Sequence, residues 1–327
     1  MIKSKIAGIG SYVPSHRMTN SDFEKLVETS DEWITTRTGI KERRICGDSE
    51  TNSDMALAAA RNALEMAGVQ PDEIDLILVG TVTPDYRLPS AACIVQKRLG
   101  LVNAAAMDVV AACAGFLYGL STGDVYIKSG KYKKVLVIGV EKLSSITDYT
   151  DRGTCILFGD GAGAAVLVPS EDESGLLSTF MKSDGRLGDL LWIPDGGSKF
   201  PSQKFKSENS HQVYIKMNGS EVFKHAVRQM ENSARRVLSE AGLTEADVDW
   251  LIPHQANNRI ITSTAKRLGI PMERVFVNIE KYGNTSSASV PIAIDEAWRG
   301  GKIKKGDILV LTAIGGGLAW AAAAYRW

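Results

Sequence analysis

The chain has 327 residues, enough to bury a large core and to form about two domains. Its 38 Lys and Arg residues balance 38 Asp and Glu residues, which argues against a globally basic protein that binds nucleic acid. No apolar run reaches the ~18 residues that a membrane-spanning helix needs, and the N-terminus is too weakly apolar for a secretory signal. The four cysteines show neither a CxxC motif nor metal-ligand spacing. We therefore expect a reduced, cytoplasmic protein with no metal site.

The first third of the chain alternates apolar runs that are typical of strands with helical patterns. A strand is expected at 6–13 and a helix at 21–38. This helix would carry Thr29, Trp33 and Arg37 on one face, because they are spaced by four. Taken alone, such a face is more typical of an ordinary amphipathic helix than of a binding site. The next expected elements are a helix at 53–68 closed by Gly68, a strand at 74–80, a loop at 84–89 and a helix at 90–100 capped by Ser90.

The stretch Asp108–Tyr118 organises the chain. It joins a short apolar strand, 104–109, to a run without charge that extends to Gly123. This pattern predicts that Cys113 begins a helix buried on most sides, with small neighbours that leave room for a substrate. A helix start presents free N–H groups, and its dipole lowers the pKa of a thiol. Judged from this stretch alone, Cys113 is more often a small buried residue than a nucleophile, because most free cysteines are buried and unreactive.

The second half of the chain repeats the order of the first. Four pairs of segments match in the same order: Ala67–Asp75 with Ala241–Asp249, Lys97–Gly100 with Lys266–Gly269, Gly130–Lys134 with Gly301–Lys305, and Gly159–Gly163 with Gly315–Ala319. The matches predict an α/β protein with two duplicated halves, 1–174 and 175–327, each with a mixed sheet. Strands are also expected at 134–139 and 164–168. The polar segment 184–211 is expected to be a surface loop.

The repeat predicts that two further residues, His254 and Asn284, lie close to Cys113 in the folded chain. Asn284 lies in the segment that corresponds to the start of the Cys113 helix, and His254 corresponds to the end of the strand at 74–80. Each alone is more often structural, but strand ends and helix starts are where α/β proteins gather their chemistry. The joint arrangement therefore indicates a catalytic site. The other three histidines are expected on the surface: His16, His211 and His225.

Two glycine-rich stretches, 159–163 and 315–317, resemble phosphate-binding loops only in composition. Neither follows a strand and opens a helix, as a dinucleotide fingerprint requires, so we expect no nucleotide cofactor. The second stretch instead predicts a backbone N–H group beside the cysteine, as part of an oxyanion hole.

Several of these segments together resemble one family, β-ketoacyl-acyl carrier protein synthase III of the thiolase superfamily. The segments are Asp108–Phe116, His254–Asn257, Gly283–Ser286 and Gly315–Gly317. The resemblance covers nearly the whole chain and implies a thiolase-like fold with α-β-α-β-α layers. It also implies an acyltransferase that performs a decarboxylative Claisen condensation between an acyl-CoA primer and malonyl-acyl carrier protein. This reaction initiates fatty acid biosynthesis; the family implies no resident cofactor, and a homodimer.

In the mechanism that the resemblance implies, the Cys113 thiolate takes the acyl group and releases CoA. Malonyl-acyl carrier protein then loses carbon dioxide, and its enolate attacks the acyl group on Cys113. His254 and Asn284 would donate hydrogen bonds to the malonyl thioester oxygen. The N–H groups of Cys113 and Gly316 would form the oxyanion hole for the other carbonyl.

The resemblance also assigns binding residues. The CoA-binding set is Thr29, Trp33, Arg37, Arg152, Gly219 and Asn257, with Trp33 and Arg152 on either side of the adenine. Arg259 would recognise the carrier protein, and Lys224, Lys266 and Arg267 either extend that basic patch or form a solvated helix surface. Leu88 and Ile314 stand near the acyl pocket, where the family commonly has bulkier aromatic residues. Smaller residues there would admit a longer or branched primer.

Three other functions compete with this interpretation. A papain-like hydrolase has Cys, His and Asn in the same order, but its Cys-Gly-x-Cys-Trp start is missing here. A relative from a specialised, polyketide-type pathway could share all three residues and differ only in its pocket. A binding protein without activity is less consistent with the complete set of Cys113, His254 and Asn284.

Overall fold

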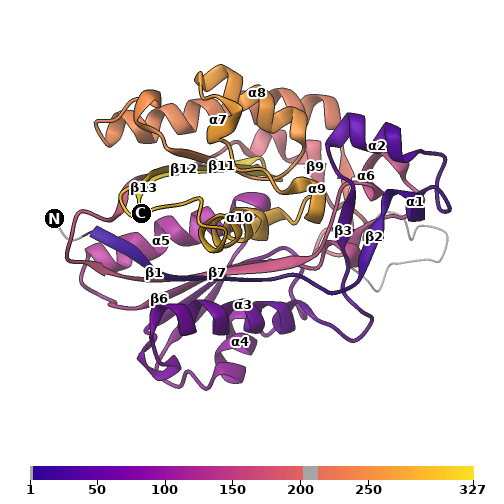
Figure 1. Cartoon of the computed structure of the whole chain (residues 1–327). Coiled ribbons are helices and arrows are strands. Elements are labelled where there is room, and N and C mark those ends of the chain that lie inside the picture. The colour runs from indigo at the N-terminus through magenta and orange to yellow at the C-terminus, as the bar shows by residue number, and fades with distance from the viewer. Residues whose placement is uncertain (1–2, 202–212) are drawn as a thin grey trace.

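The computed structural model describes residues 3–201 and 213–327 and contains two mixed sheets (Figure 1). The first sheet has the strand order β1-β7-β6-β4-β5. Its strands are β1 (Lys3–Tyr12), β4 (Leu76–Gly80), β5 (Ala105–Val109), β6 (Val135–Glu141) and β7 (Gly161–Ser170). The second sheet has the order β11-β12-β13-β8. Its strands are β8 (Gly175–Ser183), β11 (Trp250–Pro253), β12 (Ile308–Gly315) and β13 (Ala319–Arg326).

The two sheets share one pairing pattern, as expected of a duplication. In the first, β4 runs parallel to β5 and β6, and β7 is antiparallel to β6 and β1. In the second, β11 is parallel to β12, and β13 is antiparallel to β12 and β8. A parallel bridge between Leu251 and Val275 stands where β5 lies in the first sheet. Strands β7 and β8 belong to different sheets, so the chain passes from the first sheet to the second between Ser170 and Gly175.

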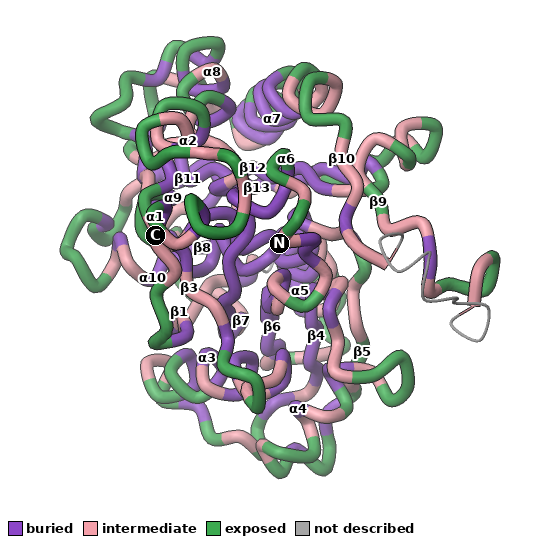
Figure 2. Tube along the Cα trace, turned by 90° about the vertical axis from the view of Figure 1, so that its right-hand side faces the viewer, coloured by how far each residue is buried: buried purple, intermediate pink, exposed green. Residues whose placement is uncertain are grey.

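Helices complete five layers (Figure 1). In chain order they are α3 (Asn52–Ala67), α4 (Ala91–Leu99), α5 (Gly115–Lys128), α7 (Gly219–Glu240), α8 (Asn258–Leu268) and α10 (Ser289–Arg299). Helices α3 and α4 cover the outside of the first sheet, α7 and α8 the outside of the second, and α5 and α10 lie between the sheets. Figure 2 shows burial concentrated in the sheets and around α5, with exposed residues along the outer turns. The uncharged run after Cys113 thus becomes the first turns of a central helix, as predicted.

Local capping sets the ends of the outer helices. The Ser90 side chain accepts a hydrogen bond from the backbone of Cys93 at the start of α4, and Gly100 ends the helix with a left-handed φ of 74°. Thr51 caps α3 and Gly68 ends it in the same way. These helices, and the strands β4 to β7, lie where the sequence predicts them, within two or three residues at their ends.

The single helix predicted at 21–38 is wrong. The structure has two short helices, α1 (Asn20–Phe23) and α2 (Asp31–Thr38). Ser30 has extended backbone and its side chain caps Trp33, so it begins a new helix instead of continuing one. Thr29 therefore precedes α2 and does not share a helix face with Trp33 and Arg37.

The segment from 184 onward is not simply a polar surface loop. Its described part forms a 3-10 turn at Gly185–Leu190 and strand β9 (Leu191–Trp192), which pairs with β10 (Lys216–Met217). Leu187, Leu190 and Leu191 pack against the buried side chain of Trp320 and its neighbours. These leucines stand among mostly polar residues, and their packing holds the segment against the cluster around Trp320. His211 lies outside the described residues; His16 is exposed and His225 partly buried.

The remaining short elements are β2 (Arg17–Thr19), β3 (Glu42–Arg44), α6 (Arg152–Cys155) and α9 (Ile279–Tyr282). Within the described part of the chain, no helix is long and apolar enough to cross a membrane.

Candidate active site

Cys113 lies on a strained turn between β5 and α5. The 3-10 turn Ala112–Ala114 precedes the helix, and Ala112 has a left-handed φ of 45°. A residue with a Cβ rarely adopts this conformation, which costs about 1–3 kcal/mol and persists where the surroundings enforce it. Cys113 is 8% exposed, at the start of the central helix.

The second half repeats this turn before α10. The 3-10 turn Ser286–Ala288 precedes the helix, and Ser286 has a φ of 50°. Ala112 therefore corresponds to Ser286, so the structural counterpart of Cys113 is Ser287. Asn284 lies three residues before Ser287, just ahead of the turn. The sequence therefore paired the correct helix starts, but Asn284 itself is not the residue that corresponds to Cys113.

Two glycines let the helix starts dock tightly on the sheets. A Cβ placed on Gly315 would lie 2.4 Å from the backbone nitrogen of Cys113, and one on Gly139 would lie 2.3 Å from the carbonyl oxygen of Ser287. Side chains at these positions would push the two turns away from the sheets. Gly315 thus lies directly against Cys113, in the stretch 315–317 that the sequence predicts to bring a backbone N–H group beside the cysteine.

His254 follows β11 and is held as a neutral ring. Its backbone N–H donates to Thr312 (2.8 Å), and its Nδ1 lies 2.7 Å from the Ser289 hydroxyl. The ring is 1% exposed, and burial lowers its pKa to about 3. Ser289 Oγ also accepts from the Gln255 N–H (3.4 Å), so its own proton is free to bond Nδ1. With the Ser289 hydroxyl as the donor to Nδ1, the neutral ring carries its proton on Nε2, from which it can donate to a ligand.

Asn284 presents a second donor. Its backbone N–H donates to Leu157 (2.8 Å), and its carbonyl accepts from Gly159 (3.0 Å). Its side-chain Oδ1 accepts from the Ser286 N–H (2.8 Å). Because the oxygen is occupied, the Nδ2 amide is left as the group that can donate to a ligand.

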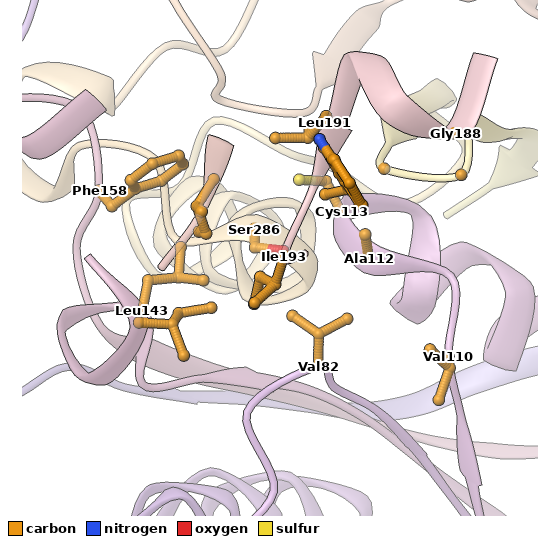
Figure 3. Close-up of a pocket in the computed structure, with 15 residues that line it drawn as sticks. Val82, Val110, Ala112, Cys113, Leu143, Phe158, Gly188, Leu191, Ile193 and Ser286 are labelled. Carbon is orange, nitrogen blue, oxygen red and sulfur yellow. The ribbon is translucent and has the colours of Figure 1, made fainter. Parts of the chain in front are cut away.

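Two cavities meet at Cys113. A cavity of about 270 Å³ is lined by Cys113, His254 and Asn284. A second cavity, of about 400 Å³, begins at Cys113 and Ser286 and has an almost wholly apolar wall. Figure 3 shows this wall; its labelled apolar side chains include Val82, Val110, Leu143, Phe158, Leu191 and Ile193. The sulfur therefore stands between a cavity that contains two donors and an apolar cavity that suits a hydrocarbon chain.

The pKa of Cys113 differs from the sequence-based expectation. Burial raises it to about 12; a hydrogen bond from Ser286 lowers it, and the nearby charge of Glu141 raises it further. The helix-start argument predicted a lowered pKa, and that prediction is wrong for this structure. Loss of water around the sulfur outweighs the favourable helix start.

The comparisons with known proteins agree with one another. The family model for 3-oxoacyl-[acyl-carrier-protein] synthase III matches residues 107–185, and the model for the C-terminal part of that family matches 238–327. A β-ketoacyl-[acyl-carrier-protein] synthase III from Caldanaerobacter subterraneus subsp. tengcongensis is 51% identical over 327 residues, covering 100% of this chain and 98% of the relative. A β-ketoacyl-[acyl-carrier-protein] synthase III 1 from Halalkalibacterium halodurans is 54% identical, covering 100% and 99%. The chain belongs to the β-ketoacyl-[acyl-carrier-protein] synthase III family.

Solved structures show the same fold. The 3-oxoacyl-[acyl-carrier-protein] synthase III from Aquifex aeolicus VF5 has a TM-score of 0.92 and 52% identity, covering 99% of this chain and 100% of its own. The priming β-ketosynthase from the R1128 polyketide pathway has a TM-score of 0.93 at 38% identity, covering 99% and 96%. The chain thus has the thiolase-like fold and is an acyl-transferring condensing enzyme of fatty acid initiation, as the resemblance implied.

Four of the six residues that the family resemblance assigns to CoA line the 270 Å³ cavity. They are Trp33, Arg37, Gly219 and Asn257. The guanidinium carbons of Arg37 and Arg152 lie 5.7 and 5.2 Å from the centre of the Trp33 ring. Asn257 caps α8 and donates to the Arg37 carbonyl (3.2 Å), which joins the two halves at this cavity. Thr29 does not line the cavity, and its hydroxyl is buried without a hydrogen-bond partner.

The predicted basic patch is partly neutralised. Arg259 is exposed, lines the mouth of the same cavity and lies over the Phe223 ring. Lys224 forms an ion pair with Glu221 (2.7 Å), and Arg267 forms one with Glu231. Lys266 is exposed. Arg259 therefore combines charge with a place beside the cavity, whereas Lys224 is paired within α7 and Arg267 is paired with Glu231 of the neighbouring α7.

The two predicted acyl-pocket residues do not lie in the apolar cavity. Ile314 lines the 270 Å³ cavity beside His254. Leu88 is 87% exposed and lines neither cavity. The apolar wall comes instead from residues that sequence reasoning missed, because an apolar side chain after a strand does not reveal whether it faces a cavity or the core. Among the described residues, no group of three or more His, Cys, Asp or Glu is placed to hold a metal ion.

Proposed function

We propose that the chain condenses an acyl group from acyl-CoA with malonyl-acyl carrier protein, with loss of carbon dioxide. The observation that supports this most directly is the position of Cys113 at the junction of two cavities. The apolar cavity suits the acyl chain. The other cavity suits the pantetheine of each substrate in turn, because it leads from the sulfur past His254 to the exposed mouth at Trp33.

In the first half-reaction, Cys113 attacks the acyl-CoA thioester and CoA leaves. The negative charge on the carbonyl oxygen would be held by the N–H groups of Cys113 and Gly316. The backbone of Gly315 passes against that of Cys113, which supports this pairing. No resident cofactor is required for the step.

In the second half-reaction, malonyl-acyl carrier protein loses carbon dioxide and its enolate attacks the acyl group. His254 Nε2 and Asn284 Nδ2 would donate to the thioester oxygen as it becomes negative. Both are neutral donors fixed by bonds on their other side, which is how a preorganised oxyanion site works.

Further assignments extend this proposal. Trp33, Arg37, Arg152, Gly219 and Asn257 would bind CoA at the cavity mouth, and Arg259 would meet the acidic carrier protein there. Thr29, Lys224, Lys266 and Arg267 contribute at most indirectly. All four cysteines are free, which is consistent with a cytoplasmic location.

We also propose a homodimer formed through strand β5. This strand is the edge of the first sheet, and Met107 is exposed on it. Val110 is 78% exposed although it lines the apolar cavity, so that cavity opens on the same face. A second copy would cover this face, and in that arrangement Leu88 could still contribute to an acyl cavity.

The half-reactions test the proposal. Intact-mass measurement after incubation with acyl-CoAs of increasing length should show one acyl group, lost in Cys113→Ala and retained in Cys155→Ala. His254→Ala and Asn284→Ala should still be acylated but release labelled carbon dioxide from malonyl-acyl carrier protein about 10²–10³-fold more slowly. Normal decarboxylation with failed acylation in both variants would instead support a relay of the hydrolase type.

A further inference from the structure

Glu141 is a buried carboxylate that the proposed reaction does not use. It ends β6 and has no exposed surface. It accepts hydrogen bonds from the Thr83 hydroxyl (2.7 Å), the Thr81 hydroxyl (3.2 Å) and the Val82 N–H (3.1 Å). These bonds come from the loop after β4, one wall of the apolar cavity.

No cation balances this carboxylate. Within residues 3–201 and 213–327, no Lys, Arg or His forms a salt bridge with Glu141. The adjacent Lys142 turns its Nζ to the Glu50 carbonyl (2.6 Å), and the nearby Asp160 bonds Cys46 and Ser144. A buried charge without a counter-ion is costly, and burial raises the pKa of Glu141 to about 7.

Ser286 connects this carboxylate to the sulfur of Cys113. Its hydroxyl donates to Glu141 Oε1 (3.2 Å), and the same side chain is the hydrogen-bond partner of the Cys113 sulfur. Ser286 and Cys113 line the apolar cavity together (Figure 3). A hydroxyl can accept one proton while donating its own, so Cys113, Ser286 and Glu141 form a continuous path for a proton.

We propose that Glu141 receives, through Ser286, the proton that the Cys113 thiol loses when it becomes the nucleophile. The S–H bond of Cys113 breaks as its proton passes to Ser286 Oγ, and the Ser286 hydroxyl proton passes to Glu141 Oε1. A thiol and a carboxylate become a thiolate and a carboxylic acid. The buried site keeps one negative charge throughout, so no new charge is created away from water.

Glu141 is a better acceptor here than His254. The pKa of His254 is lowered to about 3, whereas that of Glu141 is raised to about 7, so a proton is held more firmly on the carboxylate. His254 is also engaged by Ser289 through Nδ1. This leaves His254 neutral for its role as a donor in condensation.

The proton balance closes over one turnover. The departing CoA sulfur takes a proton from water at the open mouth, so Glu141 stays protonated while the acyl group occupies Cys113. The enolate then forms near a neutral Glu141 and meets no repulsion from it. When condensation expels the Cys113 thiolate, the same path returns the proton and restores thiol and carboxylate. Ser286 touches the reacting sulfur; Glu141 acts through it and is a positioning residue.

Alkylation of Cys113 by iodoacetamide tests the relay without any acyl substrate. Peptide mass spectrometry would follow Cys113 separately from the other cysteines across pH 5 to 10. In the wild type the rate should rise through an inflection near the pKa of Glu141 and then level off. In Glu141→Gln and in Ser286→Ala it should be about 10²-fold lower at pH 7 and climb about tenfold per pH unit without levelling.

Two controls separate this role from a structural one. Asp160→Asn removes another buried carboxylate of the same half, outside the path, and should keep the inflection. The double variant Glu141→Gln/Ser286→Ala should lose no more than either single variant, because both interrupt one path. An inflection and plateau that survive in Glu141→Gln or Ser286→Ala would overturn the proposal.

A spectroscopic measurement needs no variant with a perturbed fold. Infrared difference spectra of wild-type enzyme on acylation should show a new carboxylic-acid band that shifts with ¹³C-glutamate labelling. Acylation without this band would also overturn the relay. The inference builds on the proposed function, yet the two can fail separately: absent acylation of wild-type Cys113 refutes the function, whereas the alkylation profile decides the relay.

Discussion

Neutral, fixed donors distinguish the polar side of the site from its nucleophile. His254 is neutral because it is buried, and an asparagine carries no charge. Ser289, the first residue of α10, contacts Nδ1 of His254, and Ser286, in the turn before α10, donates its N–H to Oδ1 of Asn284. Ser289 and Ser286 therefore decide which atoms of the two side chains face a ligand. Ser286 ends the Gly283–Ser286 motif and Ser289 lies three residues beyond it, and only their contacts reveal what they do.

Ser289 should control decarboxylation through the tautomer of His254. Ser289→Ala removes the hydroxyl 2.7 Å from Nδ1, so the Nε2 proton is no longer enforced. We expect release of carbon dioxide from malonyl-acyl carrier protein to fall about 10–100-fold, while acylation of Cys113 stays normal. A merely structural serine would impair both half-reactions.

Ser287→Ala is the matched control for that experiment. Its hydroxyl is buried in the same turn but donates to the Gly80 carbonyl (2.6 Å), away from His254. It should leave the ratio of the two half-reactions unchanged. An equal loss of both steps in Ser289→Ala would argue against the tautomer role.

At the scale of elements, short helices carry several of the residues that are proposed to bind CoA, and the longer helices and strands form the core of the fold. Helix α2 has only eight residues, yet its Ser30 cap and its contact with α8 hold Trp33 and Arg37 at the cavity mouth. Arg152 comes from α6 and also donates to the Glu28 carbonyl (2.9 Å), so three segments meet around one indole. An adenine placed between Trp33 and Arg152 requires the guanidinium to move off the ring, because 5.2 Å is too close for an intervening base.

Trp33→Ala should raise KM for acyl-CoA and leave KM for malonyl-acyl carrier protein nearly unchanged. A lost aromatic–base stack is worth about 1–3 kcal/mol, which corresponds to roughly 5–150-fold. Steady-state kinetics with each substrate varied would measure this. Trp250→Ala is the control, since Trp250 also has a cation over its ring, Lys302 at 5.9 Å, but lines neither cavity. Equal KM changes for both substrates would contradict the assignment.

At the scale of the whole molecule, two similar strained turns lie between the two sheets. The same pairing pattern in both sheets places the starts of α5 and α10 between them, and Gly139 and Gly315 allow close contact. The first turn carries Cys113, and the second carries Ser286 and follows Asn284.

The exposed edge of β5 should form the dimer. Met107→Lys places a charge on this edge, where it would oppose pairing with a second copy. Light scattering after size-exclusion chromatography should show twice the chain mass of 35.3 kDa for the wild type and a shift toward a single chain for Met107→Lys. Met272→Lys, at an exposed methionine elsewhere, should stay dimeric. A monomeric wild type would refute the dimer.

Local sequence signals determined much of this protein. The capped helices α3 and α4, the apolar strands and the uncharged start of α5 follow from propensity, caps and periodicity, which act over a few residues. The repeat and its motifs were enough to predict that Cys113, His254 and Asn284 come together. Their catalytic roles stay predictions for the half-reaction experiments.

Only the tertiary structure decided the electrostatics and the shape of the cavities. The pKa of Cys113 rises because distant segments remove water from it, and Glu141 becomes important because the second half brings Ser286 against it. Likewise, Leu143, Phe158 and Ile193 line one cavity although they come from separate connections. Desolvation and cavity shape depend on which surfaces meet across the fold, and no local pattern of residues encodes that meeting.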